Sequence, residues 1–478
     1  MLKRLKELAS DSLTYGLSSM LSQFLSLFLV PFYTKELQPE DYGVLAMSAI
    51  LLGFFSPLAG LGMDGALFRY YSMSDDPERK NAYFSLATQL KTAAMLLACL
   101  LLIPFYSLLN GAFFEGMLTT LQFGLFLGTF LGDNFSALTI VTLRSERKVK
   151  KIALVNVATL CVTLTLSIWL VLFEKMQVTG ALTAGLVGSL FRAVFYWSDS
   201  RRHFRWVAYD RALLKDLLGY GLPVIPHKMQ AQVIHTFTAF IINHQLGIAT
   251  AGLYAVATKL AKPLSFVVGM VQQSWVPLKF QIHKTDKDPA HTFKQLISLY
   301  WVGIIALWGV LSLLTPWLYH WLIDPKYWAG IPYVPFIMGI SVAQAIYFKI
   351  TTGFELSTRQ PMMIKASFWG MITLVVLSLL TMSFYTPYSF ILLQSMAFLI
   401  MGAILFPEAS RMLKINYPFV AIMAFALVVG VTVIALFNAQ KTILVVLGLA
   451  GIIVASFVVL WALFPKFSAR WVLQRNVQ

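Results

Sequence analysis

The chain has 478 residues, of which 58% are hydrophobic and only 12% are charged, and its mean hydropathy is +0.73. A soluble protein of this length needs a polar surface that this composition cannot supply, so an integral membrane protein is predicted. The net charge of +16 would suggest nucleic-acid binding in a soluble chain, but in a membrane protein its placement indicates orientation, and no nucleic-acid partner is expected.

Apolar stretches recur along the whole chain. A hydrocarbon core of roughly 30 Å needs about 20 apolar residues per helix, and about fourteen stretches meet this requirement. The predicted spans are 13–33, 42–63, 84–106, 117–142, 152–173, 180–198, 219–243, 252–274, 296–316, 332–354, 362–384, 389–406, 418–437 and 442–463. The first is too long for a signal peptide and lacks a small-residue cleavage site, so we interpret it as a retained helix. The predicted fold class is an all-α polytopic membrane protein.

Lysine and arginine are distributed unevenly among the connections between these spans. Counted from the amino terminus, every second connection together holds 27 of the 37 basic residues, whereas the alternate connections hold four. Those four are Lys35, Lys175, Lys326 and Lys441. By the positive-inside rule, the basic connections and both termini are predicted to be cytoplasmic.

A basic segment follows the sixth span. Between Asp199 and Asp216, five Arg and Lys residues alternate with large apolar ones, which is typical of an amphipathic segment lying on the inner leaflet. We therefore expect the chain to divide here. The predicted parts are an N-lobe (1–198), a cytoplasmic amphipathic linker (199–218), a C-lobe (219–406), and two further helices with a cytoplasmic tail (407–478).

An internal repeat supports this division. Residues 11–17 (DSLTYGL) match residues 216–222 (DLLGYGL) at five of seven positions, and each segment opens a block of six predicted spans. About thirty residues later, 42–46 (YGVLA) and 251–255 (AGLYA) share Gly and Ala in register. Because six is even, the two lobes should have the same orientation and be related by an axis along the membrane normal. Their interface is the expected substrate site.

Sequence motifs for catalysis or cofactor binding are absent. We find no GxxxxGK[ST] phosphate loop, no HExxH and no Cys/His cluster with metal spacing, so neither a cofactor nor a metal is expected. Cys99 and Cys161 lie in apolar spans and are interpreted as small buried side chains. The predicted loops are too short to hold the second substrate of a polymerase. A transporter is therefore favoured over an enzyme.

Several cations lie inside predicted spans, where an ionisable group costs a few kcal/mol or more unless it faces water or a partner. The candidates for substrate binding are Lys228, Lys259, Lys262 and Lys349. For each of them the alternative is a side chain that snorkels to the interface, and this is the favoured reading of Lys91 and Arg192. Several cations from the second lobe predict a positive cavity and an anionic cargo.

Acidic residues inside or at the end of spans are fewer. Asp133 lies in the fourth span and Asp64 at the end of the second. Each carboxylate could take up a proton or a sodium ion in a coupling or gating step, or could pair with a neighbouring cation. The sequence leaves both readings open.

Residues 60–71 (GLGMDGALFRYY), which follow 39–43 (PEDYG), resemble the polysaccharide flippases of the multidrug/oligosaccharidyl-lipid/polysaccharide (MOP) exporter superfamily. The number of predicted spans, the predicted cytoplasmic termini and the six-plus-six repeat are also similar to those of that superfamily. The resemblance implies a MATE-like fold of two six-helix lobes plus two C-terminal helices, in the cell inner membrane. It also implies that Asp64 and Arg69 match a charged element of the family.

The cargo implied by the resemblance is an undecaprenyl-pyrophosphate-linked oligosaccharide repeat unit, flipped outward for O-antigen, capsule or exopolysaccharide synthesis. Arg69 and the lysines would then bind substrate, the last two helices would offer a groove for the lipid tail, and a polysaccharide polymerase and chain-length regulator would be partners, with membrane lipids around them. The main alternative is a cation-coupled multidrug exporter of the same fold; a flippase for the peptidoglycan precursor and a membrane polymerase are further ones. Exporters of cationic drugs need buried carboxylates, whereas here cations outnumber acids.

Overall fold

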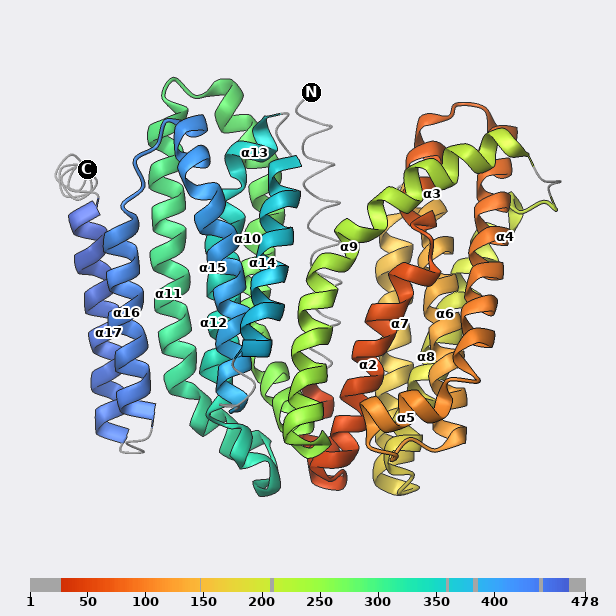
Figure 1. Cartoon of the computed structure of the whole chain (residues 1–478), viewed down its shortest axis with the longest axis horizontal. Helices are drawn as coiled ribbons and strands as arrows, with labels where there is room; N and C mark the ends of the chain where they lie inside the picture. The colour runs from red at the N-terminus through yellow and green to blue at the C-terminus, as the bar shows by residue number, and fades with distance from the viewer. Residues whose placement is uncertain are drawn as a thin grey trace. The chain divides into compact units, whose positions relative to one another are not determined.

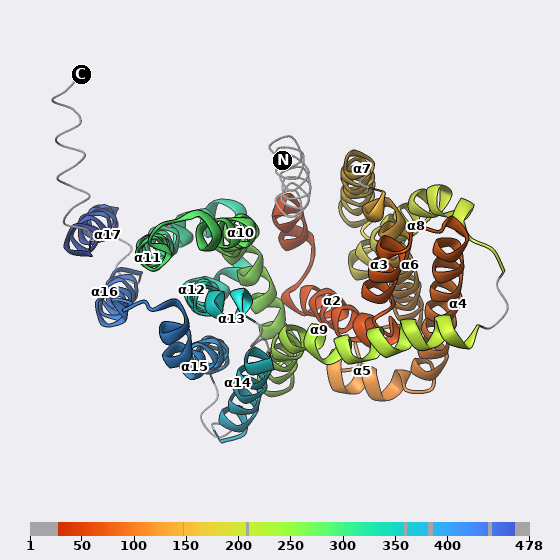
Figure 2. The ribbon, with the colours of Figure 1, turned by 90° about the horizontal axis from the view of Figure 1, so that it is seen from above.

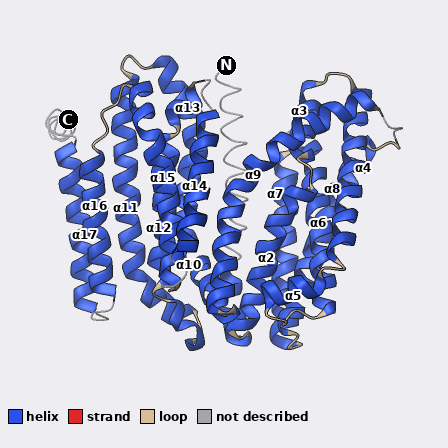
Figure 3. Ribbon diagram, viewed as in Figure 1, coloured by secondary structure: helices blue, strands red, loops and turns tan. Residues whose placement is uncertain are grey.

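The computed structural model describes residues 27–146, 148–206, 210–357, 361–380, 386–437 and 442–463, and within these ranges it contains helices and no strand (Figure 3). Eleven helices of this part are long and apolar enough to cross a membrane. The predicted all-α polytopic membrane fold is confirmed. Of the three remaining predicted spans, 219–243 lies inside a longer helix, 442–463 is the last helix, and 13–33 lies mostly outside the described residues.

The chain forms two compact units, residues 1–256 and 257–478. The predicted division into lobes at 199–218 stays a prediction, and helix α9 lies in the first of these two units. The helices of the first unit (Figure 1) are α2 (Pro39–Ala59), α3 (Met63–Met73), α4 (Pro77–Leu102), α5 (Tyr106–Phe114), α6 (Thr120–Ser145), α7 (Val149–Ile168), α8 (Gln177–Ser200) and α9 (Arg211–Leu246), with a π-helical turn at Trp169–Phe173 and a 3-10 turn at Arg201–His203. The helix α10 (Ile248–Thr285) begins in the first unit and continues into the second.

A break between α2 and α3 shapes the first unit. Leu61 and Gly62 both have positive φ angles, of 49° and 67°, so the helix ends and restarts in a new direction. A Cβ atom on Gly62 would clash with the carbonyl oxygen of Gly221, and one on Gly221 would lie 2.6 Å from that of Leu61. Glycine is therefore required on both sides, because only hydrogen atoms fit between the two backbones.

The helix α9 accounts for the second half of the predicted linker. The structure continues one helix from Arg211 to Leu246, without a break at the predicted start of the seventh span. Leu213 and Leu217 are buried in a cluster with Met63, Tyr83 and other residues of α3 and α4. The apolar face that we assigned to the inner leaflet therefore packs against protein in this half of the segment.

The two segments that match in sequence around Gly43 and Gly252 contact one another. A Cβ atom on Gly43 would clash with the carbonyl oxygen of Ile248, and one on Gly252 would clash with that of Pro39. Ile248 precedes Gly252 by four residues, and Pro39 precedes Gly43 by four. The contact is thus reciprocal, as expected of two equivalent helices crossing about a two-fold axis.

The second unit is built around one buried helix. Its elements are the rest of α10, α11 (Pro289–Leu322), a 3-10 turn (Pro325–Gly330), α12 (Tyr333–Ile350), α13 (Thr352–Leu356), α14 (Pro361–Leu380), α15 (Pro387–Leu413), α16 (Phe419–Phe437) and α17 (Thr442–Leu463). Figure 2 shows α12 enclosed by α10, α11, α14 and α15, and nearly all of its residues are buried. The helices α16 and α17 pack against α11 and expose large apolar side chains, which a lipid environment accommodates.

Candidate functional site

Two buried charges of the first unit form an ion pair next to the α2–α3 break. The Lys91 ammonium lies 2.6 Å from Asp64 Oδ1, and the side chain of Lys91 is only 1% exposed, against 35% for Asp64. Gly60 at the break lies close to the same ammonium, since a Cβ atom there would be 3.8 Å from Lys91 Nζ. The snorkelling prediction for Lys91 is wrong, because a carboxylate within reach lets the ammonium stay inside.

A second ion pair joins the neighbouring helices α6 and α8. The Arg192 guanidinium donates to Asp133 Oδ1, and each side chain is about one-third exposed. The adjacent Asn134 amide donates to Ser56 Oγ at 3.0 Å, which ties α6 to α2. Arg192 therefore has a partner within the protein, and its reading as a snorkelling residue stays a prediction. Asp64 and Asp133 are thus both paired here, and their role in coupling or gating stays a prediction.

The cations Lys259 and Lys262 of the second unit lie on α10, three residues apart and hence on one face. Both side chains are partly buried. Within the described ranges, the structure gives neither of them a hydrogen bond or an ion pair. They are the predicted substrate-binding residues whose charge has no protein counterpart in the described part of the chain.

Lys349 of α12 is fully buried in a cage of uncharged groups. Its ammonium donates to Gln272 Oε1 at 3.0 Å and lies 4.5 Å from the ring centroid of Trp275 and 4.8 Å from that of Tyr300. Aromatic faces attract a cation but carry no net charge. No described carboxylate lies within 4.0 Å of this ammonium, so its charge is screened but not neutralised.

Glu355, six residues after Lys349 in the chain, pairs instead with Lys279, whose side chain is 3% exposed. Glu355 also accepts a hydrogen bond of 2.9 Å from Thr351 Oγ1. Sequence reasoning missed Lys279, because we placed it in the basic connection 276–295, whereas α10 continues to Thr285. Its spacing of four residues from Trp275 and seven from Gln272 was the available signal, since these positions share one helix face.

The two units therefore differ in how their buried charge is balanced. In the first, Lys91 and Arg192 are each paired with a carboxylate. In the second, Glu355 pairs with Lys279, while three predicted substrate-binding lysines have no ion pair among the described residues: Lys259, Lys262 and Lys349. A buried cation without a counter-ion is costly, so an anion would stabilise these three charges.

The remaining predicted site residues lie in the first unit. The exposed Arg69 guanidinium lies 4.8 Å from the ring centroid of Tyr220 and 5.9 Å from that of Tyr70. This stacking leaves the planar N–H edge of the guanidinium available to an acceptor. Lys228 lies in α9, but its side chain is outside the described part of the structure.

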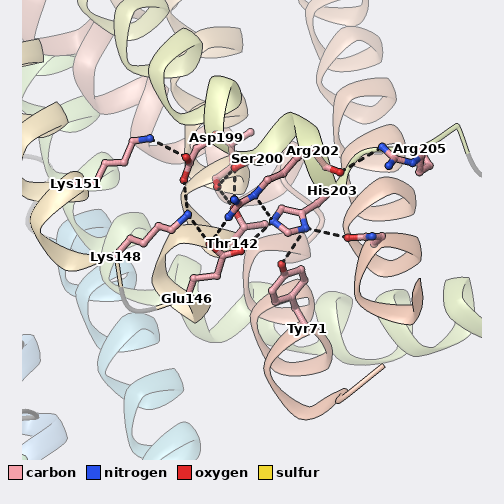
Figure 4. Close-up of polar contacts among 12 residues, drawn as sticks. Tyr71, Thr142, Glu146, Lys148, Lys151, Asp199, Ser200, Arg202, His203 and Arg205 are labelled. Carbon is pink, nitrogen blue, oxygen red and sulfur yellow. Dashed lines mark hydrogen bonds and ion pairs between the residues drawn. The ribbon is translucent and has the colours of Figure 1, made fainter. Parts of the chain in front are cut away.

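A polar network joins the residues that follow α6 to those that follow α8 (Figure 4). Glu146 accepts from Lys148 and Arg202 and contacts His203, which also contacts Asn81 Oδ1 at 2.9 Å. Burial raises the pKa of Glu146, but the hydrogen bond and charge of Lys148 and the other cations outweigh it and hold that pKa below its usual value. In turn, Glu146 raises the pKa of Lys148. Sequence reasoning missed this network, because its members are distant in the chain.

The chain is similar to three known proteins in sequence or in structure. Lsg locus putative protein 1 of Haemophilus influenzae is 22% identical over 296 residues, which cover 58% of this chain and 67% of that protein. An inward-facing multidrug resistance MATE family transporter of the MOP superfamily superposes with a TM-score of 0.69 at 14% identity, over 83% of this chain and 94% of that one. The lipid II flippase MurJ, in an inward closed conformation, superposes with a TM-score of 0.62 at 14% identity, over 95% and 99%.

The two structural likenesses show that the chain shares the fold of these two proteins, which is the MATE-like fold that the resemblance implied. The family model described as "Polysaccharide biosynthesis protein" matches residues 35–307, which is more than half of the chain. The chain therefore belongs to the polysaccharide biosynthesis protein family, as a multi-pass membrane protein.

Proposed function

We propose that the chain is a flippase that moves an undecaprenyl-pyrophosphate-linked oligosaccharide repeat unit from the cytoplasmic to the outer face of the inner membrane by alternating access. Its products would serve O-antigen, capsule or exopolysaccharide synthesis and would pass to a polysaccharide polymerase and its chain-length regulator. Membership of a polysaccharide biosynthesis family and a fold shared with transporters support this proposal.

The observation that carries the proposal is the uncompensated charge of Lys259, Lys262 and Lys349. A buried cation without a counter-ion is costly, so a protein keeps it where an anion arrives. A pyrophosphate group supplies such charge and accepts hydrogen bonds from ammonium groups. Lys349 is enclosed in this structure, so Lys259 and Lys262 would meet the anion first, and the Lys349 cage would have to open before contact.

Physical chemistry explains why a protein is required for this step. Each sugar hydroxyl that enters hydrocarbon without a partner costs roughly 2–7 kcal/mol, so an oligosaccharide crosses a bilayer extremely slowly by itself. A polar path through the protein removes that barrier. An anion that moves outward also gains about 2.3 kcal/mol per charge for each 100 mV of inside-negative potential. Under this proposal the chain transports and does not catalyse, and a coupling ion is not required.

The alternative is a cation-coupled multidrug exporter, which the likeness to a MATE transporter favours. An exporter of cationic drugs needs carboxylates that the drug can reach. The partly exposed acids Asp64, Asp133 and Glu355 are each paired with a cation of the protein. This arrangement supports the anionic cargo, because a cationic drug would have to displace a lysine or arginine first.

The proposal is tested by deleting the gene and locating the lipid-linked oligosaccharide. Repeat units that accumulate on the cytoplasmic face support it, and an unchanged glycan profile with altered drug resistance would favour export of drugs. Units that reach the outer face but stay unpolymerised would indicate a polymerase. Complementation with Lys259→Gln/Lys262→Gln should fail at normal protein level, whereas the control Lys365→Gln, which removes an exposed lysine of α14, should restore the glycan.

A further inference from the structure

The segment that follows α8 exposes an aromatic side chain after exposed arginines. After Ser200 the chain makes the 3-10 turn Arg201–His203 and then extends. The side chain of Trp206 is 87% exposed, and Arg201 and Arg205 are exposed on either side of the turn. In a membrane protein, a tryptophan at the end of a span typically lies in the headgroup layer.

This segment is fixed to the first unit and does not depend on the membrane for its shape. The ring of Phe204 packs 5.4 Å from that of Trp197, and the backbone N–H of Arg205 donates to Ser85 Oγ at 2.8 Å. His203, which precedes Phe204, contacts the side chains of Asn81 and Glu146 (Figure 4). The exposed side chains are therefore presented by a fixed backbone, which lowers the entropy cost of binding.

Two acids near this segment, Glu146 and Asp199, already have cationic partners. Glu146 pairs with Lys148 and Arg202, and Asp199 pairs with Lys148 and Lys151. Among the described residues, the Arg205 guanidinium donates to the backbone carbonyls of Arg202 and Phe204, at 3.3 and 3.0 Å. Within the described ranges, neither Arg201 nor Arg205 forms an ion pair. The surface keeps an excess of positive charge beside an exposed indole.

The position of the segment along α8 indicates which partner it meets. The helix has 24 residues, so it is about 36 Å long and exceeds a hydrocarbon core of roughly 30 Å. Its last turn and the residues that follow therefore emerge into the headgroup layer, where phosphate groups lie. We propose that Arg201, Arg205 and Trp206 form a binding site for an anionic phospholipid of the leaflet at this end of α8.

Lipid binding is tested on the full-length protein, purified in a neutral detergent, by following thermal unfolding as phosphatidylglycerol is added. We expect stabilisation of the unaltered protein, and a midpoint lipid concentration about thirtyfold higher for Arg201→Gln/Arg205→Gln. The double variant Arg201→Lys/Arg205→Lys should keep most of the response. The control Lys284→Gln/Lys287→Gln removes two exposed charges at the end of α10 and should behave like the unaltered protein.

Three results would overturn the proposal. The first is an equal response of the arginine-to-glutamine variant and the control, which would mean that any surface cation serves. The second is the same stabilisation by phosphatidylcholine, which would mean that the charge is irrelevant. The third is full stabilisation by inorganic phosphate without lipid, which would make the site one for a free anion.

The depth of the indole gives an independent measurement. A spin label attached at Trp206→Cys, in protein that also carries Cys99→Ala and Cys161→Ala, reports collisions with oxygen, which dissolves in lipid, and with an aqueous nickel complex. In bilayers containing phosphatidylglycerol we expect more oxygen and less nickel contact than for a label at Lys284→Cys. Equal collision rates at the two positions would place Trp206 in water and refute the site.

Discussion

The ion pair between Lys279 and Glu355 should respond unequally to loss of its two members. Lys279 is 3% exposed, and Glu355 is its ion-pair partner. Removing one partner of a buried pair leaves an uncompensated charge and costs about 3–5 kcal/mol. Glu355→Ala should therefore lower the free energy of unfolding by about this amount.

Lys279→Met should cost less, because the acid that remains is better solvated. Glu355 is 24% exposed and keeps its hydrogen bond from Thr351 Oγ1. A partly hydrated carboxylate that retains one donor is expected to cost about 1–2 kcal/mol. The two variants should thus differ by about 2 kcal/mol, and Lys279→Met/Glu355→Leu should recover much of the loss because no charge stays buried.

The assay is urea unfolding of the detergent-solubilised protein, followed by tryptophan fluorescence, since Trp275 lies on α10 one turn before Lys279. Equal losses for the two single variants, or a larger loss for Lys279→Met, would refute the reasoning from exposure. A double variant as unstable as Glu355→Ala would show that the loss comes from packing and not from charge.

Three further predictions follow from the contacts described above. Gly43→Ala should destabilise the protein by about 1–3 kcal/mol in thermal unfolding, because its Cβ atom clashes with the backbone of Ile248. The control Gly269→Ala on α10, where nothing lies within 4 Å of the added Cβ atom, should be neutral or stabilising. Equal effects of the two substitutions would contradict the reciprocal contact. Lys349→Gln should lower glycan export at normal protein level, with Lys365→Gln as the exposed control; unimpaired export would exclude Lys349 from the transport path. Folding lowers the pKa of Glu146, so the stabilisation from its ionised form is complete above the unfolded pKa near 4.3 and is lost as pH falls through the folded pKa. Glu146→Gln should therefore flatten the pH dependence of stability in this acidic range. An unchanged profile would show that Glu146 does not contribute to the acid sensitivity of the fold.

Hydropathy predicted the membrane-spanning helices well, because any backbone in hydrocarbon must form a helix and cover itself with apolar side chains. Hydropathy did not predict where the helices end once they leave the bilayer. The helices α9 and α10 continue as amphipathic helices beyond their apolar cores, to Arg211 and Thr285 respectively, and this extension hid Lys279 among loop residues.

The partners of the buried charges could not be predicted from the sequence. Asp64 and Lys91 are 27 residues apart, and Asp133 and Arg192 are 59 apart, so only the packing of α3 on α4 and of α6 on α8 brings them together. Lys259, Lys262 and Lys349 of the second unit were identifiable, because a lysine within an apolar stretch stands out whatever its neighbours are. The reciprocal glycine contact was partly predictable, since the sequence showed the repeat but not that its two copies pack against each other.

The central claim is that the chain carries a lipid-linked oligosaccharide across a bilayer, and transport by purified protein tests it most directly. The protein is reconstituted in liposomes that carry a labelled polyprenyl-pyrophosphate oligosaccharide, and a membrane-impermeant oxidant then measures how much glycan reaches the outer surface. We predict rapid exposure with the unaltered protein and slow exposure with Lys259→Gln/Lys262→Gln or without protein. Equal rates in all three preparations would contradict the account.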